Sequence, residues 1–179
     1  YDPELDQHLP VELSNSVTYT GWDLAISLKE TADYTCSCTL TFNNLTGDIF
    51  VKDWTREHIP VPEQKKRVIS QYRQWMPSII GIEAVAYQEA LIQLLATEML
   101  PIRKIKPTKD KVTRIASTYT AFERGQVYLP KNHPLLAEFR NEYALFPDPG
   151  YHDDLLDATE MAITLASGGL NPYTESDVG

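Results

Sequence analysis

The stretch from His152 to Ala158, His-Asp-Asp-Leu-Leu-Asp-Ala, organises the interpretation of the whole sequence. It opens a segment with helical spacing that runs to Ser167, so it predicts a helix whose first turn carries three carboxylates. Two further acids, Asp23 and Glu83, each end a run of residues typical of a β-strand. Hard divalent cations such as Mg²⁺ prefer carboxylate oxygens as ligands. We therefore expect these acids from separate elements to form one site.

The order of patterns along the chain predicts an α/β fold. Alternating β-branched and aromatic residues predict an antiparallel meander of three strands, at residues 17–23, 35–42 and 49–54. Helical spacing and short apolar runs then alternate, and they predict a helix from 63 to before 77, a strand at 78–83, a helix at 86–100, a strand at 102–105, a helix at 109–122, a strand at 126–129 and helices at 134–143 and 153–167. A meander followed by crossover units implies a mixed sheet of five or slightly more strands, with helices on both faces.

Length and composition predict one compact domain. The chain has 179 residues, of which 42% are hydrophobic. Residues 1–15 are predicted to be an irregular lead-in, 16–168 the domain and 169–179 a flexible tail. The acidic, proline-containing start is typical of a piece cut from a longer polypeptide. We expect an intracellular protein without a membrane contact, because no apolar run is long enough to cross a bilayer and no signal-peptide pattern opens the chain.

Charge and missing motifs narrow the function classes. The formal charge is −9, but eight of the 25 acids follow Arg140, after which no Lys or Arg occurs. The first 140 residues thus carry 17 acids against 16 bases, which leaves room for a positive surface. No glycine-rich motif for ATP or dinucleotides is present, the four histidines lack zinc-like spacing, and no serine lies in a G-x-S-x-G context. Cys36 and Cys38 are too few for a zinc site.

Helical phase separates the acids of the last helix. Asp154 lies on the apolar stripe that should pack on the sheet, so it is predicted to be the inward acid, with Asp153 as a close second. Asp157 shares the neighbouring stripe with Asp153 and is assigned to the helix surface or to a supporting role. His152 is a candidate for orienting water or contacting a leaving oxygen. Taken singly, each acid also fits a turn or a helix start.

Convergence of the acids would require a cation, because carboxylates a few ångström apart repel one another. Two divalent ions about 4 Å apart can activate water on one side of a phosphodiester and stabilise the leaving oxygen on the other. The ordered acids therefore favour metal-dependent phosphodiester hydrolysis.

Basic residues are concentrated between Arg103 and Arg114, interrupted by a single acid, Asp110. In isolation this stretch fits a solvated helix. Its functional interpretation is contact with DNA phosphates, for which Lys109, Lys111 and Arg114 are the candidates.

Four stretches resemble the nuclease domain of the terminase large subunits of tailed bacteriophages. They are, in order, Thr20–Ala25 (TGWDLA), Ile80–Glu83 (IGIE), Lys109–Arg114 followed by Glu123–Val127, and the opening HDDLLDA, and the likeness covers residues 16–166. The resemblance implies an RNase H-like fold and an endonuclease that cuts double-stranded concatemeric viral DNA during genome packaging, with little sequence preference. It also implies two ions, Mg²⁺ or Mn²⁺.

By the same resemblance, the metal ligands and catalytic residues would be Asp23, Glu83 and Asp154, with Asp153 as an additional or alternative ligand. The implied partners are DNA, a packaging ATPase domain of the same polypeptide, the small terminase subunit and the portal, in the host cytoplasm. The ATPase domain is missing from this sequence, which fits an isolated nuclease domain or another member of the superfamily. Two alternatives stay open: a junction resolvase or ribonuclease of the same fold, and a non-catalytic adaptor that binds portal or motor proteins.

Overall fold

A mixed seven-stranded sheet forms the centre of the protein in the computed structural model, which describes residues 15–25, 34–83, 86–168 and 173–175. The strand order is β6-β3-β2-β1-β4-β5-β7. The strands are β1 (Ser16–Asp23), β2 (Thr35–Asn43), β3 (Ile49–Glu57), β4 (Ile79–Glu83), β5 (Ile102–Pro107), β6 (Val127–Tyr128) and β7 (Tyr173–Glu175). The helices are α1 (Val61–Trp75), α2 (Ala86–Ala96), α3 (Lys111–Glu123), α4 (Leu136–Leu145) and α5 (Asp154–Ser167).

Strand pairing brings the ends of β1 and β4 and the start of β2 to one edge of the sheet. β1, β2 and β3 form the predicted antiparallel meander, in which Asp23 pairs with Cys36 at the start of β2. β4 runs parallel to β1, with Trp22 opposite Ile82, and β5 continues the parallel arrangement. Because parallel strands end at the same edge, Asp23 and Glu83 close adjacent strands there.

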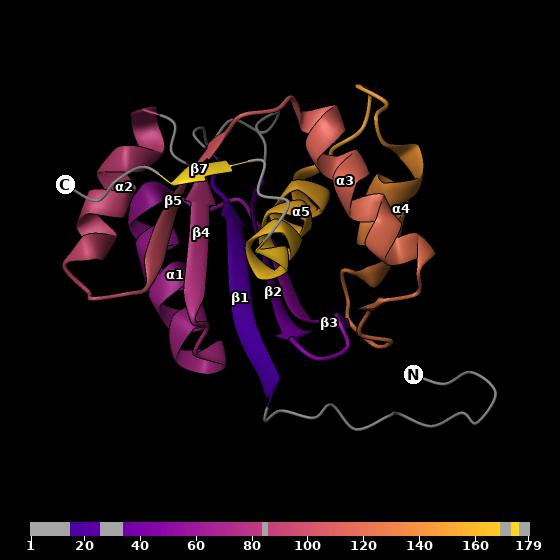
Figure 1. Ribbon diagram of the computed structural model, residues 1–179. Coiled ribbons are helices and arrows are strands. Elements are labelled where there is room, and N and C mark those ends of the chain that lie inside the picture. Colours follow the sequence, from indigo (N-terminus) through magenta and orange to yellow (C-terminus); the bar gives the residue numbers. More distant parts are fainter. Residues whose placement is uncertain (1–14, 26–33, 84–85, 169–172, 176–179) are drawn as a thin grey trace.

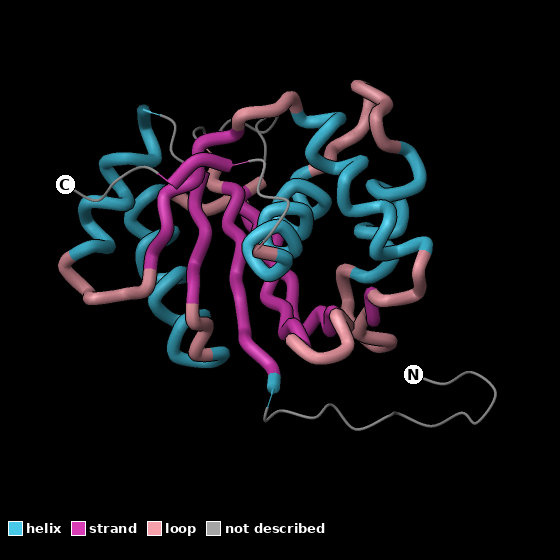
Figure 2. Tube along the Cα trace, in the orientation of Figure 1, coloured by secondary structure: helices cyan, strands magenta, loops and turns pink. Residues whose placement is uncertain are grey.

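Helices cover both faces of the sheet, as the sequence predicts (Figure 1). α1 and α2 lie on one face, where Trp22, Val68, Ile82 and Leu95 are buried together. α5 lies on the other face with α3 and α4 beside it, as Figure 2 shows. The core on that side contains a larger set of buried side chains, among them Leu40, Trp54, Phe139 and Leu155. The α/β class and the two-sided cover are confirmed.

A glycine allows α5 to lie very close to β1. A Cβ atom at Gly21 would lie 2.5 Å from the carbonyl oxygen of Ala158 and 2.8 Å from the backbone nitrogen of Ala162. Both are backbone atoms, so a larger residue would push the helix away from the strand. This approach places the first turn of α5 beside the end of β1.

Several predicted boundaries differ from the observed ones, and two of the differences have a clear physical reason. α2 ends at Ala96 instead of residue 100, because Met99 adopts a left-handed conformation (φ 53°) and Pro101 cannot continue a helix. Residues 173–175 belong to the predicted flexible tail, yet they form β7 and pair antiparallel with β5, which otherwise would be an open sheet edge. The other residues of the predicted tail, 169–172 and 176–179, lie outside the described residues. Of the predicted lead-in, residues 1–14 lie outside the description as well. Among the described helices, none combines the length and apolar character needed to cross a bilayer.

Candidate active site

Acids from three elements influence one another at the edge where β1 and β4 end. Burial raises the pKa of Asp23 well above its ordinary value, and the negative charges of Asp157, Asp154 and Glu83 raise it further. The charge of Lys111 acts in the opposite direction. Asp23 and Glu83 end adjacent strands, and charge effects weaken with distance, so the predicted acids of β1, β4 and α5 lie near one another.

Asp154 occupies the inward position that its helical phase predicts. Its residue is only 4% exposed, and its Oδ2 accepts a hydrogen bond from the backbone N–H of Tyr34 at 3.3 Å. The Nδ1 of His152 lies 3.5 Å from the same oxygen, while half of the His152 side chain is exposed. His152 is thus placed beside the site, at its solvent side.

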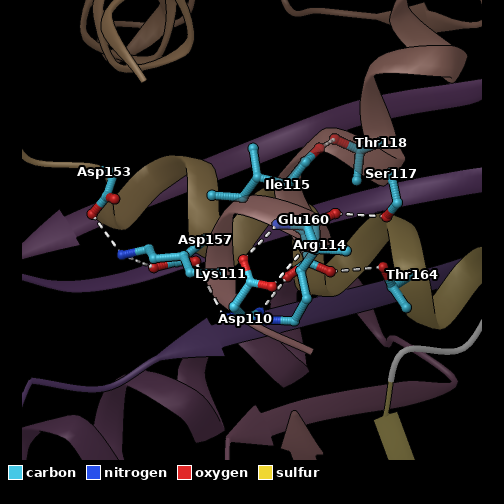
Figure 3. A network of polar contacts seen from close by, with 11 residues as sticks. Asp110, Lys111, Arg114, Ile115, Ser117, Thr118, Asp153, Asp157, Glu160 and Thr164 are labelled. Atoms are coloured by element: carbon cyan, nitrogen blue, oxygen red, sulfur yellow. Dashed lines mark hydrogen bonds and ion pairs between the residues drawn. The ribbon is translucent and has the colours of Figure 1, made fainter. Parts of the chain in front are cut away.

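Of the two places predicted for Asp157, the structure excludes the helix surface, and the supporting role stays a prediction. Its side chain is 13% exposed and contacts Lys111, and it is the carboxylate with the largest effect on Asp23. Burial raises the pKa of Asp157 to about 6 against the opposing effect of Lys111. The stripe that Asp157 shares with Asp153 and Glu160 faces α3, whose basic residues contact these acids (Figure 3).

Lys111 is an internal counter-charge of the acid cluster (Figure 3). Its Nζ lies 2.7 Å from the Oδ1 of Asp153 and 2.5 Å from the Oδ2 of Asp157. Burial lowers the pKa of Lys111, but the two carboxylates outweigh this effect and hold the pKa above its ordinary value. Asp153, the second predicted ligand, therefore belongs to the site through this lysine.

Arg114, one of the three candidates for contact with DNA phosphates, is buried and does not lie on the surface. Its residue is 6% exposed, and its guanidinium binds Glu160 on α5, with 2.6 Å between Nη1 and Oε2. Thr164 donates a hydrogen bond to the other oxygen of Glu160 at 2.8 Å (Figure 3). Lys109 is exposed, and its DNA contact stays a prediction.

The sequence contained a signal for this helix pairing. Lys111 and Arg114 are three residues apart on α3, and Asp157 and Glu160 are three residues apart on α5. Residues at this spacing lie on one face of a helix, so two bases on one helix match two acids on another.

Glu142 is a buried acid that was not predicted from the sequence to be a site residue. It lies on α4 at 5% exposure, and its Oε2 accepts the backbone N–H of Leu156 in the first turn of α5 at 2.9 Å. Asp153, at the N-cap of α5, makes no such capping bond with its side chain. Burial raises the pKa of Glu142 to about 7. Nothing in the local pattern of α4 marks this residue, because its partner comes from another helix.

With this geometry in place, comparison with known proteins identifies the family. A family model described as the terminase RNaseH-like domain matches residues 20–165. The chain belongs to this family. The resemblance inferred from the ordered motifs is thereby confirmed. A comparison with curated protein sequences gives no match.

Solved structures share the fold of this terminase RNaseH-like domain at low identity. The large terminase nuclease from thermophilic phage G20c with bound cobalt has a TM-score of 0.62 and 13% identity, over 84% of this chain and 82% of that chain. The human cytomegalovirus terminase nuclease domain gives 0.57 and 15%, over 90% and 87%. T. thermophilus RuvC in complex with a Holliday junction substrate gives 0.52 and 11%, over 89% and 99%. These structures confirm the RNase H-like fold.

The donor chemistry of this terminase RNaseH-like domain fits divalent metal ions. Carboxylates are hard oxygen ligands, and Asp23 is buried among like charges that raise its pKa. Within the part of the chain that the structure describes, no three Asp, Glu, His or Cys side chains are arranged as a group that could hold an ion. Lys111 offsets part of the repulsion in this arrangement. The acids of the site therefore lie near one another, but the described residues do not form a complete metal-binding group.

Proposed function

We propose that this terminase RNaseH-like domain is a metal-dependent endonuclease that cleaves double-stranded DNA during viral genome packaging. The observation that carries the proposal is that Asp23 and Glu83 end adjacent parallel strands, where Asp154 and Asp157 of α5 lie close enough for their charges to raise the pKa of Asp23. Carboxylates this close repel one another, and bound cations would relieve that repulsion. The binding of catalytic metal ions therefore explains why the acids are brought together. Two of the solved structures with this fold are terminase nucleases, which supports the same activity.

The ligands of two Mg²⁺ or Mn²⁺ ions would be Asp23, Glu83 and Asp154, with Asp157 beside them and Asp153 as the alternative. Bound there, the ions would supply an activated water and stabilise the leaving oxygen of the phosphodiester. Lys111 holds Asp153 and Asp157 in position and balances their charge. His152, half exposed beside Asp154, is placed to orient a water or a leaving oxygen.

The wider assignment follows from the family. We infer that the substrate is concatemeric viral DNA, cut with little sequence preference in the host cytoplasm, and that Lys109 contacts its phosphates. The partners would be the packaging ATPase domain of the same polypeptide, the small terminase subunit and the portal.

Plasmid cleavage tests the proposal directly. Supercoiled plasmid is incubated with the wild type, Asp23→Asn or Asp154→Asn in Mg²⁺, Mn²⁺ or EDTA. We expect cutting by the wild type in either metal, and none in EDTA or by the two variants. Glu123→Gln is the matched control, since Glu123 is an exposed acid at the end of α3. Equal cutting by wild type and Asp23→Asn would show that the acid cluster is not the active site.

The same assay ranks the two acids that the structure reassigns. Asp157→Asn should reduce cutting more than Asp153→Asn, because Asp157 has the larger effect on Asp23. The opposite order would restore Asp153 as the principal ligand of the pair.

The RuvC likeness makes junction cleavage the second candidate activity. A four-way junction and an RNA–DNA hybrid, compared with plasmid at equal enzyme concentration, separate the possibilities. We expect the plasmid to be cut efficiently. Cleavage confined to the junction or the hybrid would favour a resolvase or a ribonuclease.

A further inference from the structure

Planar side chains form a stack next to the acid cluster, and the mechanism above uses only one of them. The guanidinium of Arg56 lies 3.8 Å from the ring centroid of Tyr34. The rings of Tyr34 and His58 have centroids 3.8 Å apart, and His152 meets Tyr34 edge-on at 5.5 Å. We call Arg56, Tyr34, His58 and His152 the ring stack.

Three elements fix the position of the ring stack. Thr35 on β2 pairs with Glu57 on β3, so Tyr34 and His58 are the next residue on each side of this pair. Arg56 is held by an ion pair with Glu138 on α4. Arg56 thus lies on β3, while Tyr34 and His58 directly adjoin β2 and β3, which limits their movement.

A hydrogen bond joins the ring stack to the acids. The backbone N–H of Tyr34 donates to the Oδ2 of Asp154, and the Nδ1 of His152 lies 3.5 Å from the same oxygen. Any molecule bound on the rings thus lies beside Asp154.

Exposure increases from the base of the ring stack to its outer end. The Arg56 side chain is 11% exposed, Tyr34 is half-buried, and His58 is exposed. Packing explains the inner members, since a cation over an aromatic face is favourable. Packing does not explain the position of His58, because its side chain stays largely exposed in the folded protein. An exposed ring on a fixed stack is suited to receive another planar group.

A nucleobase is the planar group that this place would meet. Bases stack on aromatic rings whatever their sequence, because every base has a π-face. In a paired duplex both faces of a base are covered by its neighbours. Only an unpaired, unstacked base can therefore present its face to His58, the outer ring, which packs on Tyr34.

We propose that the ring stack is a subsite for an unpaired nucleobase of the DNA strand next to the phosphodiester that the acids cleave. This inference rests on the proposed nuclease function for the identity of the strand. The chain then favours DNA that is locally opened at the point of cleavage, without reading its sequence.

DNA binding in EDTA tests the subsite without cleavage. Fluorescence anisotropy compares a fully paired duplex with the same duplex carrying a short unpaired stretch. His58→Ala should bind the opened DNA about 5- to 20-fold more weakly than wild type, as expected for the loss of base stacking. Tyr34→Ala should cause a similar loss, because it removes the ring against which His58 packs. Binding of the paired duplex should change less than about twofold. Tyr34→Phe, which keeps the ring, should bind like the wild type.

A stacked aromatic pair at the other end of β3 provides the control. Phe50 and Tyr128 have ring centroids 4.8 Å apart, and Tyr128→Ala removes a ring there. This variant should bind both DNAs as the wild type does. Circular dichroism confirms that each variant is folded before its binding is measured.

Three results would overturn the subsite. They are unchanged binding of opened DNA by His58→Ala, equal losses on paired and opened DNA, and a Tyr34→Phe loss as large as that of Tyr34→Ala. The plasmid assay separates this failure from failure of the nuclease assignment. If the wild type cuts plasmid and the ring variants bind opened DNA normally, only the subsite is wrong. If the ring variants bind opened DNA more weakly but the wild type does not cut plasmid, the nuclease assignment is wrong and the base subsite stands.

Discussion

The ammonium group of Lys111 lies 2.5 Å from the carboxylate of Asp157, and this contact joins the start of α3 to the first turn of α5. Lys111 also binds Asp153 and lowers the pKa of Asp23. One positive charge therefore offsets several negative charges at the proposed site. A bound metal ion would relieve the same repulsion, so the contribution of Lys111 to stability should depend on metal.

Replacing Lys111 with Met should make the metal-free protein less stable by about 1 kcal/mol, a modest loss because the lysine side chain is partly exposed. Thermal unfolding in EDTA and in Mn²⁺ measures the effect. We expect Mn²⁺ to raise the Tm of the variant more than that of the wild type, since more repulsion is left to relieve.

Lys109→Met is the matched control, because Lys109 is exposed and two residues away. It should respond to Mn²⁺ as the wild type does. An equal Mn²⁺ response in all three proteins would show that Lys111 does not share the charge environment of the metal ligands.

Much of the fold can be predicted from the sequence, because hydrophobic periodicity and turn-forming residues are local features of the chain. The run Ile79–Glu83 predicts a buried strand, and the residues before Asp23 predict another, so the two acids at strand ends could be found. β7 could not be found, since its reason to form is the open edge of β5.

The site was predicted less completely than the fold. Helical phase correctly turned Asp154 inward, but it cannot tell which helix covers the adjacent stripe, so it did not show that Asp157 and Arg114 are buried between α3 and α5. The capping role of Glu142 depends on contact between α4 and α5 and leaves no local trace.

Gly21→Ala should destabilise the protein by about 2–3 kcal/mol, because its Cβ would meet backbone atoms of Ala158 and Ala162 that cannot rotate away. Because the substitution should displace α5 and its acids, the variant should also lose plasmid-cutting activity. Urea unfolding and the plasmid assay measure the two effects.

Gly81→Ala is the comparison for that variant. A Cβ at Gly81 would meet the Cδ1 atoms of Ile105 and Leu165, which are ends of flexible side chains. We expect a smaller loss of stability than at Gly21. Equal losses would mean that the close approach of α5 to β1 is not the limiting contact.

The buried ion pair between Arg114 and Glu160 should be costly to break on one side. Arg114→Met leaves the Glu160 carboxylate buried, with a side chain that is 0% exposed, and should cost about 3–5 kcal/mol in the free energy of unfolding. Replacing both partners with apolar residues should cost less than the sum of the single losses, because no charge is left unpaired.

Urea unfolding of the two single variants and of Arg114→Met with Glu160→Leu completes this cycle. Arg124→Met, at the exposed end of the same helix, should change the free energy of unfolding by less than about 0.5 kcal/mol. Strictly additive losses at Arg114 and Glu160 would contradict the coupling.

Glu142 should make stability fall as pH rises toward neutrality. Its pKa is about 7 in the folded protein, above the ordinary 4.5, so the folded state binds this proton more tightly than the unfolded state. Ionisation between about pH 4.5 and 7 therefore removes stability, on the order of 1–3 kcal/mol. Glu142→Gln cannot ionise, and its amide oxygen can still accept the Leu156 N–H.

Urea unfolding at pH 5 and pH 8 isolates this contribution from other groups that titrate in the same range. The free energy of unfolding of Glu142→Gln should rise relative to that of the wild type from pH 5 to pH 8. Glu123→Gln, which alters an exposed acid, should keep a constant difference from the wild type. If Glu142→Gln also keeps a constant difference, the carboxyl group of Glu142 is ionised in the folded protein at both pH values, and α5 is capped by a carboxylate throughout.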